Sequence, residues 1–248
     1  MYPKGMSRAE TVPYKKYRRL QMLMFSLLGV SIFLVIALFA QFTNQGASKP
    51  TNTAVRTATT APTQPDYIRN DADDPMAIGD IDAPLVLVEW TDMRCPFCAV
   101  FSRDTLPEVV KEYVDSGQVR IEINDVSFFG EDSSAAAVAA RAAGRQGKYA
   151  EFLTTVYANA PEDGHPDMPR EKLLGFAKSA GVADLDQFES DIDDPTLAEE
   201  VAQSTTYAQQ LGVNSVPFFV ADGTALSGAQ PIENFRQFLD SALANTQK

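Results

Sequence analysis

Two cysteines lie close together in the chain and are the residues best suited to chemistry. They are its only two cysteines, and they form the segment Cys95-Pro96-Phe97-Cys98. The run Leu85–Trp90 before them reads as a buried strand, and the residues after them read as a helix. A thiol at a helix N-terminus has its thiolate stabilised by free backbone amides and by the helix dipole. The spacing therefore predicts a redox-active dithiol on a strand-to-helix turn.

Other uses of two cysteines fit this sequence less well. A structural zinc site needs four ligands, and the chain contains a single histidine, His165. Haem attachment would need a histidine directly after the second cysteine, where Ala99 stands. A structural bridge more often joins distant segments, because closing a long loop constrains the unfolded chain more. An inert bridge is the remaining alternative, and no metal or bound cofactor is expected.

The beginning of the chain predicts a membrane anchor. Residues 1–19 contain six Lys or Arg residues and one acid, and no charged residue occurs from Leu20 to Ser48. As a helix, Leu20–Phe42 would extend about 35 Å, enough to cross a hydrocarbon core of about 30 Å. The basic flank is expected in the cytoplasm, which places the remainder outside. The alternative is a cleaved signal peptide, whose apolar region is usually about 7–15 residues long.

A tether and one acidic domain are expected after the anchor. Residues 43–70 are rich in Thr, Ala, Gln, Asn and Pro, which predicts a disordered linker with a reach of about 30 Å. Residues 71–248 have the size of a single domain and hold 12 Lys or Arg against 31 Asp or Glu, a formal net charge of −19. Such a charge argues against nucleic acid as a partner. With either an anchor or a signal peptide the domain is exported, and disulfides persist there.

The elements that must position the dithiol can be placed along the domain. The helix after Cys98 is expected to run to about Asp115, with a kink at Pro107. The alternating segment Val119–Val126 predicts a second strand. Residues 133–212 read as helical throughout. The expected helices there are Ser133–Gln146, Lys148–Asn159, Met168–Ala180, Asp184–Ile192 and Pro195–Leu211.

The end of the domain predicts a hairpin and a last helix. Val216–Val220 and Ala225–Ser227 flank the turn signal Asp222-Gly223. The last helix is expected from Ile232 to about Ala244, with an apolar stripe on one face. The aromatic residues expected in the core are Trp90, Phe101, Phe128, Phe129, Phe218 and Phe219. His165, in a Gly-His-Pro sequence, is expected in a solvent-exposed loop.

Three segments carry a resemblance to a known family. They read D-A-P-L-V-L-V-E-W-T-D-M-R-C-P-F-C (Asp82–Cys98), G-V-N-S-V-P-F-F-V (Gly212–Val220) and G-A-Q-P (Gly228–Pro231). With the order of the elements, they resemble the DsbA-like family of exported thiol–disulfide oxidoreductases. The resemblance covers about Met76 to Leu243 and implies an α/β thioredoxin fold with a helical insertion at about 131–211. The anchored, acidic form looks like the actinobacterial or other Gram-positive members.

The two thiols are expected to act differently. Cys95 stands nearest the solvent and the helix N-terminus, so a lowered pKa should make it the nucleophile. Cys98 lies one turn further in, should be more buried, and would be the resolving thiol. Pro96 belongs to the same active-site motif. Arg94 either adds a positive charge beside the thiolate or points away as an exposed side chain.

Glu89 and Phe97 are the two other candidates near the dithiol. Glu89 interrupts an apolar strand, and the resemblance implies a buried carboxylate there that accepts or relays the proton of Cys98. The alternative is an edge strand that leaves Glu89 in water. Phe97 stands where the best-known family members have histidine, so a weaker oxidant is expected. Phe97 is also the aromatic residue expected to face substrate.

The segment around Pro217 is expected to bind substrate. Proline within an apolar strand donates no ladder hydrogen bond. The resemblance implies a cis bond between Val216 and Pro217, packed against the disulfide. The Val216 backbone would then pair with an extended substrate peptide.

The expected function is that of a membrane-tethered, extracytoplasmic protein-disulfide oxidoreductase. Exported proteins with free thiols would be its substrates, and a quinone-linked membrane protein would reoxidise it. One alternative keeps the fold and reverses the electron flow, giving a reductase or isomerase for cytochrome maturation or disulfide repair. The other alternative is a binding or chaperone-like module whose disulfide is only structural.

Overall fold

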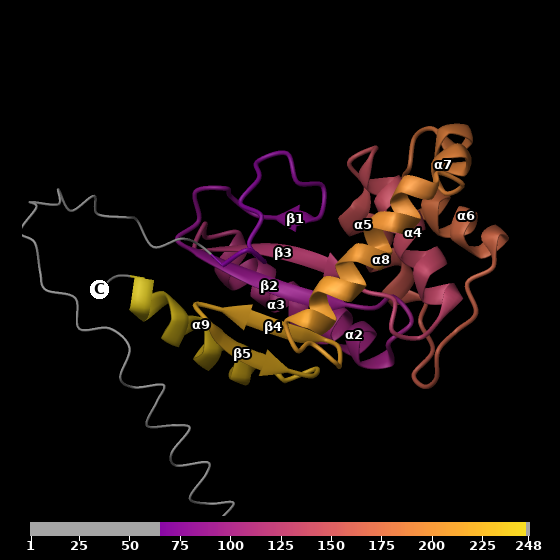
Figure 1. Cartoon of the computed structure of the whole chain (residues 1–248). Coiled ribbons are helices and arrows are strands. Elements are labelled where there is room, and N and C mark those ends of the chain that lie inside the picture. Colours follow the sequence, from indigo (N-terminus) through magenta and orange to yellow (C-terminus); the bar gives the residue numbers. More distant parts are fainter. Residues whose placement is uncertain (1–64, 247–248) are drawn as a thin grey trace, which may run out of the picture. The chain divides into compact units, whose positions relative to one another are not determined.

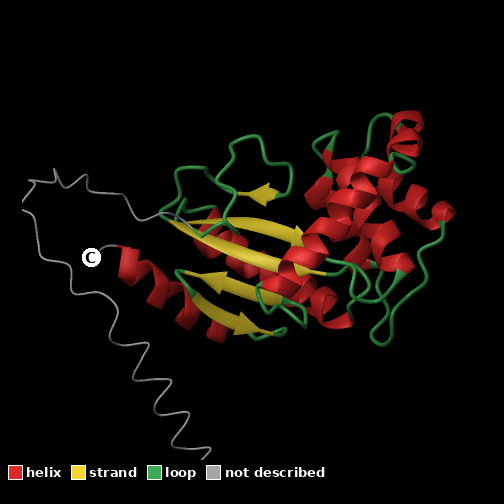
Figure 2. Cartoon of the chain, in the orientation of Figure 1, coloured by secondary structure: helices red, strands yellow, loops and turns green. Residues whose placement is uncertain are grey.

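A five-stranded sheet forms the centre of the domain in the computed structural model, which describes residues 65–246 (Figures 1 and 2). Its strands are β1 (Ala77–Ile78), β2 (Leu85–Thr91), β3 (Val119–Asp125), β4 (Phe218–Ala221) and β5 (Thr224–Ser227). They lie in the order β1-β3-β2-β4-β5. Strand β2 runs parallel to β3 and antiparallel to β4. The two-residue strand β1, which was not predicted, lies antiparallel to β3 at the edge.

The central place of β2 explains its apolar sequence. Strands β3 and β4 flank it on both sides, and six of its seven residues are buried. A strand covered on both faces reads as a continuous apolar run. The predicted hairpin is present: Ala221 pairs with Thr224 across a two-residue turn. Asp222 and Gly223 both have positive φ angles, 46° and 69°, as a tight hairpin turn of this kind requires.

The helix after the dithiol is one helical path with two widened turns. Its segments are α2 (Pro96–Val100), η1 (Phe101–Thr105), α3 (Leu106–Val109) and η2 (Val110–Val114). In η1, the Leu106 amide donates to the Phe101 carbonyl five residues back. Pro107, which has no amide hydrogen, follows directly. Where a kink was predicted at Pro107, the structure has a widened turn that ends just before this proline.

Helix α9 and the dithiol helix pack on one face of the sheet, and aromatic rings pack on both faces. Helix α9 (Ile232–Thr246) contacts α3, β2 and β4. The ring of Phe101 lies 4.6 Å from that of Phe219 and 5.0 Å from that of Phe235, measured between centroids. On the opposite face, Trp90 lies 6.0 Å from Phe218 and 5.9 Å from Tyr67. The sheet therefore has an aromatic cluster on each face.

Three of the predicted core aromatics are only partly buried. Phe128 and Phe129 lie in the loop after β3, and Phe218 begins the short strand β4. They pack against the core without being enclosed by it. Loop positions and the ends of strands have neighbours on fewer sides than the middle of a sheet. Trp90, Phe101 and Phe219 are buried as predicted.

Five helices separate β3 from β4 and form the insertion. They are α4 (Glu131–Gly144), α5 (Tyr149–Ala158), α6 (Arg170–Ser179), α7 (Leu185–Asp191) and α8 (Pro195–Gln210). Each matches its predicted range within two residues at either end. They gather beside one end of the sheet (Figure 1). A buried ion pair joins the two parts: Arg141 in α4 lies 2.6 Å from Asp125 at the end of β3.

The folded domain begins before residue 71. The backbone amides of Arg69 and Asn70 donate to the buried carboxylate of Glu122, at 2.7 and 2.9 Å. The last residues of the predicted linker 43–70 therefore belong to the domain, because a buried carboxylate needs donors. The predicted anchor Leu20–Phe42 lies outside the described residues. Between residues 65 and 246, the structure contains no helix both long and apolar enough to cross a membrane.

Candidate active site

The turn between β2 and α2 is fastened by the buried side chain of Asp92. Its carboxylate accepts hydrogen bonds from the amides of Arg94 and Phe128, at 2.9 and 2.7 Å, and from the hydroxyl of Ser133 at 2.9 Å. The backbone carbonyl of Asp92 accepts a hydrogen bond from the Cys95 amide at 2.9 Å. Burial raises the pKa of Asp92, and these donors act against that rise. Asp92 therefore joins the cysteine turn to the insertion.

The two cysteines lie at the start of α2 with free thiols. Cys98 is fully buried, and Cys95 retains 3 % exposure. The order of burial agrees with the prediction, but Cys95 is less open than expected. Its sulfur lies 3.4 Å from the carbonyl oxygen of Val216, to which the thiol donates a hydrogen bond. The loop before β4 therefore covers the outer thiol.

The surroundings move the pKa values of the two thiols in opposite directions. A hydrogen bond from the Cys98 thiol, aided by the backbone amides of Cys98 and Phe97, lowers the pKa of Cys95. Burial, together with the nearby Cys95, raises the pKa of Cys98 well above its ordinary value. A thiolate is the reactive form of cysteine. The pair is therefore asymmetric, with the charge favoured on Cys95.

The predicted substrate-binding residues lie around Cys95. The peptide bond between Val216 and Pro217 is cis, as the resemblance implied. Val216 covers Cys95 through its carbonyl. Phe97 is 63 % exposed beside the dithiol. An exposed aromatic ring and a backbone carbonyl thus adjoin the outer thiol.

Glu89 is buried inside the sheet. It is 2 % exposed, because β3 and β4 flank β2 on both sides, so the alternative of an edge strand in water is wrong. Burial raises the pKa of Glu89 to about 8, against a smaller lowering by a hydrogen bond from Thr91. The carboxyl group is therefore largely protonated at neutral pH. Thr91 also acts on Cys98, whose raised pKa it lowers slightly by hydrogen bonding.

Arg94 follows neither of its two predicted arrangements. Its side chain is 11 % exposed and donates to the carbonyls of Phe129, His165 and Pro166, at 2.6, 2.8 and 2.7 Å. His165 is exposed, as predicted, yet its ring stacks on Phe129 at 3.8 Å and its Nδ1 lies 3.0 Å from the Arg94 carbonyl oxygen. Arg94 therefore ties the turn to the loop before α6.

Sequence reasoning missed Asp92, Thr91 and Tyr157. The Tyr157 hydroxyl, from α5, lies 2.6 Å from Thr91 Oγ1 and 3.1 Å from the Asp92 carbonyl oxygen. Threonine and tyrosine carry no local signal for such contacts, which join residues 65 and 66 positions apart. An acid directly after an apolar strand was the one available sign for Asp92.

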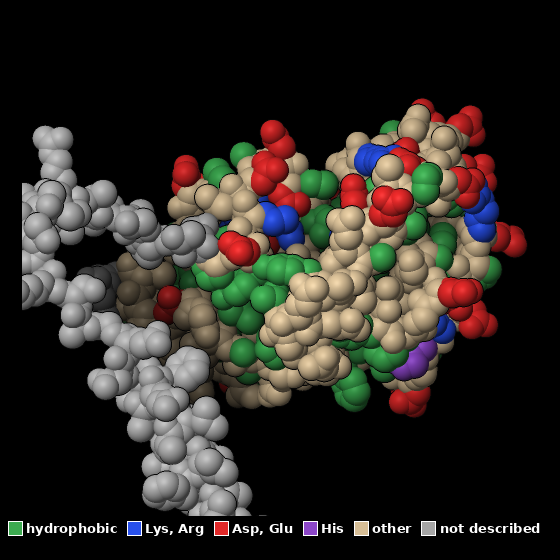
Figure 3. Space-filling view, in the orientation of Figure 1, with side chains coloured by type: hydrophobic (Ala, Val, Ile, Leu, Met, Phe, Trp, Pro, Cys, Tyr) green, Lys and Arg blue, Asp and Glu red, His purple; other side chains and the backbone are tan. Residues whose placement is uncertain are grey.

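Acidic side chains gather on the surface of the insertion. Figure 3 shows acidic side chains over the helices of the insertion, with few basic ones between them. Within the described part of the chain, no three His, Cys, Asp or Glu side chains are grouped so that they could hold a metal ion. The dithiol is therefore the feature of residues 65–246 with the clearest chemistry.

Comparisons with known proteins agree on the family. The family described as thioredoxin matches residues 71–241. A probable disulfide bond formation protein D from Bacillus cereus is 30% identical over 150 residues, covering 59% of this chain and 69% of that protein. BdbD from Bacillus subtilis, solved in its oxidised form, has a TM-score of 0.64 at 22% identity over 69% of this chain and 94% of that chain. A thioredoxin-like oxidoreductase from Silicibacter pomeroyi has a TM-score of 0.57 at 29% identity, over 70% and 94%.

A thioredoxin fold with a helical insertion and a Cys-x-x-Cys pair at the start of a helix defines a class of thiol–disulfide oxidoreductases. The chain belongs to the thioredoxin family and, within it, to the DsbA-like protein-disulfide oxidoreductases. The family resemblance predicted from three short segments is confirmed.

Proposed function

We propose that this enzyme introduces disulfides into exported proteins outside the cytoplasm, using Cys95 and Cys98. The observation that carries the proposal is the asymmetry of the two thiols: Cys95 has a lowered pKa beside Val216 and Phe97, and Cys98 is enclosed. A stable thiolate on the outer cysteine favours the reduced form of the enzyme, which makes the oxidised form an oxidant.

The reaction begins with an oxidised Cys95–Cys98 bridge. A substrate thiolate attacks the Cys95 sulfur, a substrate–Cys95 disulfide forms, and Cys98 leaves as a thiolate that takes up a proton. A second substrate thiolate then attacks the substrate sulfur of this mixed disulfide, and Cys95 leaves as a thiolate. The substrate loses two electrons to the dithiol. A quinone-linked membrane protein then removes them and restores the bridge.

Substrate binding is assigned to the groups around Cys95. The Val216 backbone would pair with an extended peptide, and Pro217 would hold this segment against the dithiol. Pro96 begins α2. Proline suits this position because its fixed φ fits the first turn and its missing amide hydrogen would have no partner within the helix. Phe97, which is exposed, would contact apolar side chains of an unfolded substrate. Contacts of this kind recognise an unfolded chain without a strict sequence.

An extracytoplasmic location rests on the N-terminal sequence and on the relatives. The basic residues 1–19 followed by the apolar Leu20–Phe42 support a single-pass anchor with the N-terminus in the cytoplasm. The Bacillus cereus relative is named a probable disulfide bond formation protein. Disulfides formed in an exported protein persist because no cytosolic thiol pool reduces them.

The opposite direction of electron flow is the second candidate. Phe97 favours it, because phenylalanine gives a nearby thiolate neither a hydrogen bond nor a charge. An anchored reductase or isomerase would keep the same site and the same mixed disulfide. Its reduction potential would lie close to that of cellular reductants.

Trapping of mixed disulfides tests the proposal. In cells, a Cys98→Ser variant should accumulate disulfide-linked complexes with exported proteins, because Cys98 is no longer present to release them. A matched Cys95→Ser variant should give none. Equal yields from both variants, or complexes from neither, would overturn the proposal.

A second measurement separates the two directions. The purified wild-type domain, in its oxidised form, is mixed with a reduced, unfolded model protein, and the loss of free thiols is followed. An oxidase consumes the thiols stoichiometrically and has a reduction potential well above that of glutathione. No thiol loss, combined with a potential below that of glutathione, would favour the reductase.

A further inference from the structure

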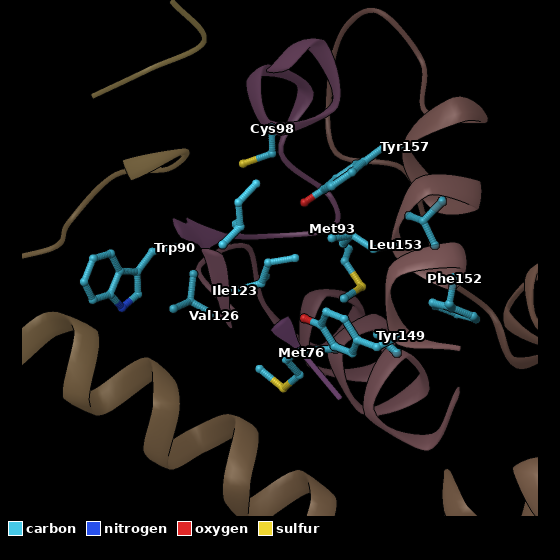
Figure 4. Close-up of a cluster of buried hydrophobic side chains, with 14 of the residues drawn as sticks. Met76, Trp90, Met93, Cys98, Ile123, Val126, Tyr149, Phe152, Leu153 and Tyr157 are labelled. Atoms are coloured by element: carbon cyan, nitrogen blue, oxygen red, sulfur yellow. The ribbon is translucent and has the colours of Figure 1, made fainter. Parts of the chain in front are cut away.

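A buried network of hydroxyl groups lies next to the inner thiol. Thr91 is fully buried, and its Oγ1 lies 2.6 Å from the Tyr157 hydroxyl. Hydrogen bonding by Thr91 also lowers the pKa of both the Glu89 carboxyl group and the Cys98 thiol, against the larger rise caused by burial. Figure 4 shows the Tyr157 hydroxyl directed towards the Cys98 end of the buried cluster. Thr91 is therefore the group that the acid, the thiol and the tyrosine share.

The register of the sheet explains why Thr91 lies between the acid and the thiol. Glu89 and Thr91 are two residues apart in β2, so their side chains point to the same face. Opposite Glu89 in β4 is Phe219, whose ring packs on Phe101 of the dithiol helix. This face is therefore the one that the helix carrying Cys98 covers.

The chemistry of the site needs a proton at this place. When Cys98 leaves the bridge, its thiolate forms in a fully buried site, where an unneutralised charge is costly. Glu89 is protonated at neutral pH and can supply the proton. A hydroxyl group has one hydrogen to donate and two lone pairs to accept, so it can pass a proton between two partners.

We propose that Thr91 carries the proton between Glu89 and Cys98, and that Tyr157 from the insertion orients the Thr91 hydroxyl. The inference rests on the proposed dithiol function and assigns it one further catalytic residue. As Cys98 leaves, the Thr91 hydroxyl proton passes to the sulfur and the Glu89 proton passes to Thr91. Glu89 ends as a carboxylate, Cys98 as a thiol and Thr91 as a neutral hydroxyl. When Cys98 attacks a mixed disulfide, the same transfers run in reverse.

Tyr157 is a positioning residue in this scheme. It has one hydroxyl proton and two acceptors within reach, Thr91 Oγ1 and the Asp92 carbonyl oxygen. When Tyr157 donates to Thr91, the Thr91 hydrogen is available to Cys98 or Glu89. When Tyr157 donates to Asp92, the Thr91 hydrogen is drawn towards Tyr157. The insertion thus influences the proton path through one hydroxyl.

Several other titratable groups surround the network and enter any pH profile. The groups on the packed elements are Glu89 in β2, Asp92 in the turn, Asp125 in β3, Cys95 and Cys98 in α2, Arg141 in α4, and Tyr149 and Tyr157 in α5. Burial raises the pKa of both tyrosines well above the neutral range. A change near pH 8 that depends on Thr91 therefore points to Glu89.

Substitution of Thr91 provides the test. The oxidised enzyme is reduced by a dithiol peptide in single-turnover experiments from pH 5 to 9, because Cys98 leaves in this step. Thr91→Val keeps the shape and removes the hydroxyl, and should slow the step at least tenfold, since general acid–base catalysis typically contributes about 10²–10⁴-fold. Once each rate is divided by the ionised fraction of the peptide thiol, whose ordinary pKa is about 8.5, Thr91→Val should also remove the remaining change near pH 8. Thr91→Ser should restore the rate to within threefold.

Thr105→Val is the matched control. Thr105 is also a buried threonine with a hydroxyl hydrogen bond, to the Gln230 carbonyl, but it lies outside the network. The Thr105→Val variant should be reduced by the peptide at a rate within twofold of that of the wild type. If Thr91→Val behaves like Thr105→Val, the inference fails, while the proposed function stands as long as the wild type reacts through Cys95. If the wild type forms no mixed disulfide, the proposed function itself fails.

Tyr157→Phe gives an independent result if the Thr91 variant does not fold. It should slow the same step about threefold to tenfold, whereas Tyr149→Phe, on the same helix with its hydroxyl 3.4 Å from Asp125, should not. A Tyr157→Phe variant with the wild-type rate and pH profile would overturn the role of the network.

Discussion

The sulfur of Cys95 lies 3.4 Å from the carbonyl oxygen of Val216, a residue 121 positions later in the chain. The contact brings the dithiol of α2 and the loop before β4 together at one end of the sheet. The hydrogen bond requires a protonated thiol. The thiolate would instead take its hydrogen bonds from Cys98 and the first amides of α2. Ionisation of Cys95 therefore weakens its link to Val216.

Removal of the inner thiol should raise the pKa of Cys95. The hydrogen bond from Cys98 is the largest cause of the lowered value, so Cys98→Ala should move the pKa back towards 9.0 and slow alkylation at pH 7. Thiolate absorbance, titrated with pH, measures the change. Cys98→Ser, whose hydroxyl can still donate, should give a smaller rise. Equal titration of all three proteins would contradict this view of the pair.

Glu89→Gln should stabilise the protein increasingly as the pH rises. The pKa of Glu89 is about 8 in the folded protein against an ordinary 4.5, so between these values the folded state holds a proton that the unfolded state has lost. The stability of the wild type therefore falls with rising pH, and glutamine removes that loss. The difference in unfolding free energy should grow by about 1.4 kcal/mol per pH unit from about pH 5 to 8.

Urea unfolding at several pH values measures this difference for the two proteins. A constant offset across the range would show that Glu89 ionises normally in the folded state. The same glutamine variant should slow the departure of Cys98, since no proton is then stored beside Thr91.

Asp92→Ala should destabilise the domain on the order of 3 kcal/mol, because two backbone amides and the Ser133 hydroxyl lose their buried acceptor. Urea unfolding at constant pH measures the effect. Asp73→Ala is a suitable control, since Asp73 is exposed. A loss no larger than that of the control would mean that the turn before Cys95 is held by other contacts.

Phe97→His should make the enzyme a stronger oxidant. A histidine beside Cys95 can hydrogen-bond and stabilise the thiolate, which favours the reduced form. We expect the reduction potential to rise by about 30 mV, equivalent to about 1.4 kcal/mol. Stability should change by no more than about 0.5 kcal/mol, because the side chain is 63 % exposed.

Equilibration with glutathione buffers measures the potential. Phe97→Leu, which removes the ring without adding a donor, should stay near the wild-type value. An equal rise in both variants would show that loss of the phenyl ring, and not the imidazole, sets the potential.

Local patterns predicted much of this protein. The apolar run Leu85–Trp90, the turn signal Asp222-Gly223 and the boundaries of the insertion helices depend on neighbours within a few residues. Burial on both faces, positive φ angles and helix ends all leave such local signals. The Cys95–Cys98 spacing indicated the chemistry for the same reason.

Contacts between distant segments decided the rest. The two-residue strand β1 exists only because β3 offers it a partner, and Phe128 and Phe129 are half-buried because a loop carries them. Thr91 meets Tyr157 across 66 positions, and Cys95 meets Val216 across 121. No local propensity encodes such pairs, since they depend on how the insertion and the loop before β4 pack against the sheet. The sequence by itself therefore predicted which thiols react, and the tertiary structure decided which groups surround them.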